Sequence, residues 1–87
     1  MKTKKGFLLR RMNDEYMVIA IGAASEQFNG MIRLNEAGAF LWKELEQEID
    51  EEALVRKMTE RYHGLDAQTA RADLEEFLTS IAVAIER

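Results

Sequence analysis

The first third of the chain carries its apolar residues in short runs rich in β-branched and aromatic side chains. Three such runs, Phe7–Met12, Tyr16–Ile21 and Met31–Leu34, have the composition and length typical of strands. Asn13-Asp14 separates the first two runs at hairpin spacing. Because Asn and Asp tolerate the left-handed backbone of tight turns, this pattern predicts a three-stranded antiparallel meander.

The connection between the second and third runs, residues 22–30, is rich in small residues. Phe28 is its one large apolar side chain. We predict that Phe28 folds back over the hydrophobic core as a lid.

From Asn35 onward the apolar spacing lengthens to about 3.6 residues, which is typical of helices. Asn35, Asp50 and Asp66 stand where N-caps are expected, because their side chains can accept hydrogen bonds from the free amides of a first turn. Gly64 is typical of a helix end. We predict three helices, the last reaching almost to the C-terminus, with these apolar stripes: Leu41, Trp42, Leu45 and Ile49; Leu54, Met58 and Tyr62; Ala70, Leu74, Phe77, Leu78, Ile81 and Ile85.

The elements together predict an α+β fold in which a three-stranded antiparallel sheet is followed by three helices. With 87 residues and 47% hydrophobic content, the chain can build one core. No proline, repeat or low-complexity segment interrupts it, so we interpret residues 1–87 as a single domain. Trp42 and Tyr62 lie on apolar stripes and are predicted to be core residues.

The sequence offers few groups for catalysis. It has no cysteine and one histidine, His63, which excludes thiol chemistry and any zinc site that needs several nitrogen or sulfur ligands. The pairs Glu51-Glu52 and Glu75-Glu76 are helical neighbours whose side chains diverge by about 100°. No glycine-rich phosphate loop is present. We therefore predict a protein that is not an enzyme, with no catalytic residue, metal or cofactor.

The apolar runs are also too short for export or membrane insertion. The run Phe7–Leu9 ends at Arg10-Arg11, and the longest apolar run, residues 81–85, spans only five residues. We expect a cytoplasmic protein without a membrane partner, and the missing cysteines are compatible with a reducing compartment.

Charge is divided unevenly along the chain. Residues 1–34 contain six basic and three acidic residues, whereas residues 35–87 contain six basic and thirteen acidic ones. A sheet followed by helices raises the alternative of a winged-helix DNA-binding regulator, with Gln68, Thr69 and Arg71 reading bases. The acidic residues of the same helix disfavour nucleic acid as a partner.

The stretch Ile32–Leu45, IRLNEAGAFLWKEL, resembles the PqqD-like family, in which a strand ending in Leu-Asn runs into a helix bearing a Trp. Asp50-Glu51-Glu52, Tyr62 and the segment Asp73–Leu78 are also similar to that family, so the resemblance spans nearly the whole chain. It implies a winged-helix-like domain that binds the leader of a ribosomally made precursor peptide and presents it to a radical S-adenosylmethionine (SAM) enzyme.

The resemblance further implies that the leader adds as a strand beside the third strand, against the last helix. If the second strand is central, the third is an edge with free backbone groups, open to a peptide or to a second copy in a homodimer. On the last helix we predict Arg71, Glu75, Leu78 and Ala82 as the flank facing the peptide, and Arg33 as a selector of acidic leaders. The predicted peptide-binding residues are Met31, Ile32, Arg33, Leu34, Arg71, Leu74, Glu75 and Leu78.

Overall fold

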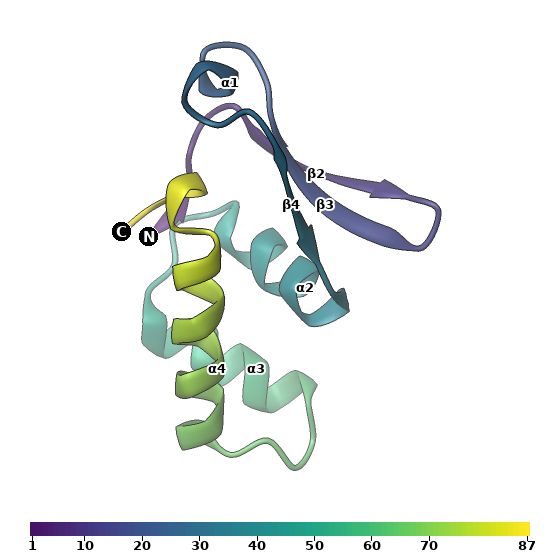
Figure 1. Cartoon of the computed structure of the whole chain (residues 1–87). Helices are drawn as coiled ribbons and strands as arrows, with labels where there is room; N and C mark the ends of the chain where they lie inside the picture. The colour runs from purple at the N-terminus through teal and green to yellow at the C-terminus, as the bar shows by residue number, and fades with distance from the viewer.

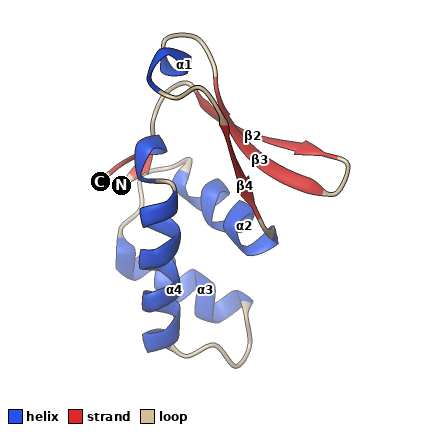
Figure 2. Cartoon of the chain, in the orientation of Figure 1, coloured by secondary structure: helices blue, strands red, loops and turns tan.

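The computed structural model describes residues 1–87 and has the predicted α+β architecture (Figure 1, Figure 2). Strands β2 (Phe7–Met12), β3 (Glu15–Ala20) and β4 (Met31–Leu34) form an antiparallel sheet in the order β2-β3-β4. Helices α2 (Glu36–Leu45), α3 (Glu51–Arg61) and α4 (Ala67–Ser80) follow. The predicted sheet followed by three helices is therefore confirmed, with β3 as the central strand.

Local signals in the sequence set the element boundaries. Asn13 adopts a positive φ of 58° in the β2–β3 hairpin, where Met12 pairs with Glu15. Each predicted N-cap accepts a hydrogen bond from the third residue after it. The distances are 2.7 Å from Gly38 N to Asn35 Oδ1, 2.8 Å from Ala53 N to Asp50 Oδ1, and 2.7 Å from Thr69 N to Asp66 Oδ1.

The core lies between the three helices and one face of the sheet. Trp42 is 0% exposed, and Phe28 packs over Phe7 with ring centroids 6.1 Å apart, so both predictions are confirmed. Full burial of a large apolar side chain stabilises the fold by about 1.5–3 kcal/mol. The fully buried large side chains are Trp42, Leu45, Leu54, Leu74, Leu78, Ile81 and Val18.

Several features differ from the sequence-based expectation. A short helix, α1 (Ala24–Gln27), interrupts the β3–β4 connection. The last helix stops at Ser80, because Ile81 leaves the helical region with φ −113° and ψ 20°, and a 3-10 turn, η1 (Ala82–Ala84), follows. The prediction of a helix reaching almost to the C-terminus is therefore wrong.

The reason for this early stop lies in pairing between the chain ends. Strand β1 (Lys2–Thr3) pairs with β5 (Ile85–Glu86), and Lys4 N donates to Ala84 O at 2.8 Å. The two termini therefore lie side by side (Figure 1). No helix of the chain has the length and apolar character needed to cross a membrane.

Candidate functional site

Strand β4 forms one edge of the sheet. It pairs only with β3, and no backbone hydrogen bond outside the sheet involves residues 31–34. In an antiparallel strand, alternate residues direct their N–H and C=O groups away from the paired neighbour. The outer side of β4 therefore offers unpaired backbone donors and acceptors, as the sequence predicts.

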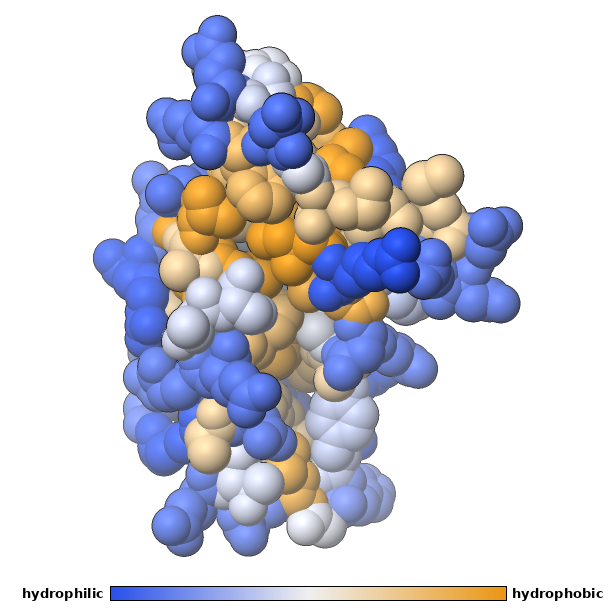
Figure 3. All heavy atoms as spheres, in the orientation of Figure 1, coloured by the Kyte–Doolittle hydropathy of each residue, from blue (hydrophilic) through white to orange (hydrophobic).

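A groove of about 510 Å³ lies next to this edge. Its walls come from the end of β4, the start of α2, the end of α3 and one face of α4. Figure 3 shows apolar surface between α4 and β4, bordered by hydrophilic side chains. The apolar lining consists of Leu34, Ala37, Leu41, Met58, Tyr62, Leu65 and Phe77.

Helix α4 contributes a single stripe to the groove. Asp73, Glu76, Phe77 and Ser80 all line it, and their spacing of three, four and seven residues places them on one helical face. Phe77 is half-buried, and its ring is the one large apolar group among these four. The α4 wall therefore combines an aromatic contact with two carboxylates.

Tyr62 closes the groove at the end of α3. Its ring meets Phe40 edge-on at a centroid distance of 6.1 Å, and its hydroxyl accepts from Arg61 Nε at 3.3 Å. The Arg61 guanidinium also lies 4.7 Å from the centre of the Phe40 ring. Tyr62 is half-buried and faces the groove, so its assignment to the core was only partly right.

The four predicted residues of β4 lie at the edge strand. Met31, 54% exposed, and Arg33 face outward, while Ile32 and Leu34 are half-buried against the core. Arg33 and Leu34 both border the groove, but only Leu34 also packs against the core. The alternation expected for a strand is therefore present.

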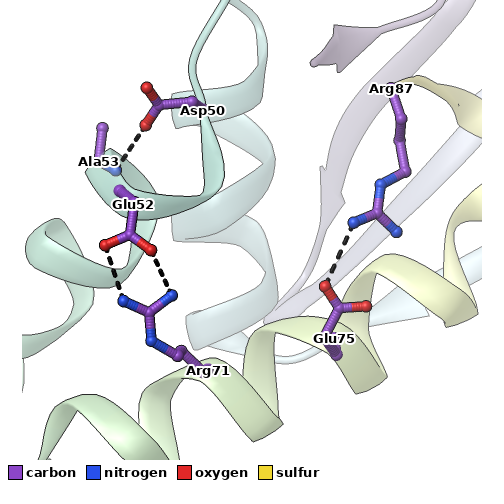
Figure 4. A network of polar contacts seen from close by, with 6 residues as sticks. All are labelled: Asp50, Glu52, Ala53, Arg71, Glu75 and Arg87. Carbon is purple, nitrogen blue, oxygen red and sulfur yellow. Dashed lines mark hydrogen bonds and ion pairs between the residues drawn. The ribbon is translucent and has the colours of Figure 1, made fainter.

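The four α4 residues that the sequence predicts to bind the peptide lie outside this groove. Leu74 is 0% exposed and Leu78 is 1% exposed, so both belong to the core. Arg71 forms a double ion pair with Glu52 of α3, and Glu75 pairs with Arg87 at 3.2 Å (Figure 4). None of these four residues lines the groove.

The difference between the predicted flank and the groove lining has a geometric cause. Period-3.6 spacing identifies the buried stripe, but the stripe has two flanks, and the sequence does not indicate which flank turns toward β4. Phe77 and Leu78 are also adjacent apolar residues. The sequence places Leu78 on the flank facing the peptide, whereas in the structure Leu78 is in the core and Phe77 lines the groove. The stripe of Asp73, Glu76, Phe77 and Ser80 was missed because three of its four members are polar.

The shifted pKa values on α3 and α4 belong to ion pairs and caps. The hydrogen bond from Arg71 lowers the pKa of Glu52, and the backbone hydrogen bond from Thr69 lowers the pKa of Asp66. Both are structural contacts that favour the ionised carboxylate. No group of three or more histidine, aspartate or glutamate side chains is arranged to hold a metal ion.

The geometry of α4 weighs against a DNA-reading role. Arg71, the predicted base contact, is held by Glu52 at 2.7 Å from Arg71 Nη2 to Glu52 Oε2. Asp73 and Glu76 stand on the same helix without ion-pair partners. Unneutralised carboxylates repel a phosphate backbone, so this helix is poorly suited to a DNA groove.

A family model described as coenzyme PQQ synthesis protein D (PqqD) matches residues 11–83, which include the end of β2, all of β3 and β4, and the three long helices. The chain belongs to the PqqD family. A comparison with curated proteins finds no match.

This PqqD family member is also similar to a solved structure, that of TbiB1 in complex with the TbiA(beta) leader peptide. The TM-score is 0.79 at 22% sequence identity, over 100% of this chain and 98% of the other. The likeness shows that the two chains share a fold.

Proposed function

We propose that the protein is a non-catalytic accessory protein that binds the leader of a ribosomally synthesised precursor peptide by strand addition to β4. The observation that carries this proposal is the unpaired edge of β4 beside an apolar groove. Membership of the PqqD family supports it, as does the shared fold with TbiB1, whose structure contains a leader peptide.

Strand addition explains how so small a protein binds an extended chain. The outer edge of β4 supplies register through backbone hydrogen bonds, each worth about 0.5–1.5 kcal/mol net. The groove supplies selectivity, because alternate side chains of the added strand point toward α4. A large apolar side chain buried there contributes about 1.5–3 kcal/mol.

The sheet has a second edge, β2, which is less suited to peptide binding. It carries the exposed side chains of Arg10 and Arg11, and charged residues on an edge strand discourage pairing with another chain. Neither residue lines the groove. We assign the peptide to β4, formed by Met31, Ile32, Arg33 and Leu34, where the outward-directed backbone groups of alternate residues would pair with it.

The proposal includes the partner that receives the bound leader. Because the chain resembles PqqD-like proteins, we assign this partner to the radical SAM class of modifying enzymes, acting in the cytoplasm.

Binding of the leader requires the β4 edge to be free. A homodimer formed through the same edge would cover the groove, so leader peptide and second copy compete, and light scattering with and without peptide measures the competition.

An NMR titration tests the binding site. Isotope-labelled protein is titrated with the leader segment of a precursor peptide encoded beside its gene. The amides of residues 31–34 and of Phe77 and Ser80 are expected to shift, while those of Arg10 and Arg11 on β2 serve as the internal control. Shifts confined to β2, or to the α3–α4 ion pair, contradict the proposal.

A further inference from the structure

The groove beside β4 has rims of opposite charge. Arg33 stands on the β4 side, and Asp73 and Glu76 stand on the α4 side, so its lining carries one basic and two acidic residues. A bound strand would run between these rims. Its own charges therefore influence how well it fits.

The charges on the two rims are not equally available. Arg33 Nη1 lies 3.5 Å from Glu15 Oε1 on the neighbouring strand, so its charge is partly compensated within the sheet. The charges on the α4 rim are not compensated. Neither Asp73 nor Glu76 forms an ion pair or a side-chain hydrogen bond with another residue.

On α4, the third carboxylate differs from Asp73 and Glu76 because it lies outside the groove and has a partner. Glu75 precedes Glu76 in the sequence but turns to Arg87 at 3.2 Å. Glu52, across from α4 on α3, is neutralised by Arg71. Of the three carboxylates on α4, the two without partners are those that line the groove beside the Phe77 ring.

A docked peptide would strengthen the influence of these carboxylates. It excludes water from the groove, which lowers the local dielectric and raises the energy of each charge–charge contact. An acidic residue of the peptide is then repelled by the α4 rim, and a basic residue is attracted. Side chains two positions apart on a strand face the same side, so the cation and the apolar anchor can both point toward α4.

We infer that Asp73 and Glu76 make the groove selective for leaders in which a lysine or arginine stands two residues from a large apolar side chain. This inference rests on the proposed function and specifies its substrate class. It reverses the sequence-based expectation that Arg33 selects acidic leaders, since the compensated Arg33 is outweighed by two free carboxylates.

Selection from a phage-displayed library of random dodecapeptides tests the inference and does not require the sequence of the leader. The immobilised targets are the wild-type protein, the double variant Asp73→Lys/Glu76→Lys, and the control Glu75→Lys, which changes the adjacent carboxylate outside the groove. Circular dichroism first verifies that all three are folded. Wild type and Glu75→Lys are expected to enrich Lys or Arg near an apolar residue, and the double variant is expected to enrich Asp or Glu.

Affinities of one selected peptide then quantify the effect. An exposed ion pair is worth up to about 1 kcal/mol, and reversing both charges replaces two attractions by two repulsions, so binding of a basic peptide should weaken by about tenfold. The Glu75→Lys substitution should change the affinity for the same peptide by less than about twofold. Added salt should narrow the difference between wild type and double variant.

The possible failures are distinguishable. Enrichment of peptides that bind at β4 without any charge preference, or an equal change in both variants, overturns the charge selection and leaves peptide binding intact. If wild-type protein enriches no peptide that perturbs residues 31–34, the proposed function itself is wrong, and the inference falls with it.

Discussion

A Cβ atom added to Gly38 of α2 would lie only 3.2 Å from Cε1 of Phe77 on α4. It would also lie 3.3 Å from Leu34 Cβ and from the capping oxygen of Asn35. The buried glycine therefore allows the aromatic ring to approach the junction between β4 and α2 closely, and this approach shapes the groove wall. The relationship gives the Leu-Asn-Glu-Ala-Gly segment a role beyond helix capping.

Gly38→Ala is expected to weaken peptide binding while leaving the fold intact. Alanine gains up to about 1 kcal/mol over glycine inside a helix, which offsets part of the crowding. The Phe77 ring must move by a few tenths of an ångström, and the groove changes shape. Calorimetric binding of a selected peptide and a thermal melt measure the two effects.

Gly30→Ala is the matched control for this variant. A Cβ atom at Gly30 meets Phe28 Cζ at 3.7 Å, an ordinary contact, and Gly30 does not line the groove. Peptide affinity should therefore be retained. Equal losses in both variants would show that the effect of Gly38→Ala is not specific to the Phe77 contact.

The ion pair between Glu52 and Arg71 should make the stability of the α3–α4 pair depend on acid. The hydrogen bond from Arg71 lowers the folded-state pKa of Glu52 below its unfolded value. Its stabilisation is therefore present above the unfolded pKa and is lost as the pH falls from about 5 through the folded pKa. Thermal melts between pH 7 and pH 3 should show this loss.

Glu52→Gln should reduce that acid dependence, because glutamine does not titrate. Part of the dependence should remain, since the pKa of the Asp66 cap is lowered in the same direction. Glu60→Gln provides the comparison, because Glu60 forms no ion pair. A Glu52→Gln melting curve that falls with acid as steeply as that of Glu60→Gln contradicts the assigned role.

Trp42 is completely buried, and its indole N–H group donates no hydrogen bond. Its side chain is 0% exposed, and its Nε1 has no hydrogen-bond partner. Leaving a buried donor unpaired costs about 1–3 kcal/mol, so Trp42→Phe removes this cost while losing part of the packed volume. We expect a net loss well below the about 3–5 kcal/mol typical of Trp→Ala, measured by urea denaturation followed by circular dichroism.

Local rules predicted most of the fold. The caps at Asn35, Asp50 and Asp66, the turn at Asn13 and the strand Met31–Leu34 each depend on a few neighbouring residues, and all were correct. The α4 side of the groove was not predicted, because it depends on how the helix is rotated against a distant strand. The end of α4 was also missed, since it is set by pairing between residues at opposite ends of the chain.

Substitutions of the adjacent residues Phe77 and Leu78 should affect peptide affinity and fold stability in opposite proportions. Leu78 is 1% exposed in the core, so Leu78→Ala should destabilise the fold by about 2–5 kcal/mol through a lost contact and a cavity. Phe77 is half-buried and lines the groove, so Phe77→Ala should cost less stability. It should cost more in peptide affinity, because the apolar wall of α4 is removed.

Chemical denaturation and peptide titration of both variants measure this contrast, with the titration performed well below the melting temperature of Leu78→Ala. The expected outcome is that Leu78→Ala binds with nearly wild-type affinity while folded, whereas Phe77→Ala is folded and binds weakly. The reverse pattern would restore the flank predicted from the sequence and place the peptide on the opposite side of α4. Because the two residues are neighbours with similar apolar character, composition and helix propensity do not account for the difference, and the rotation of α4 does.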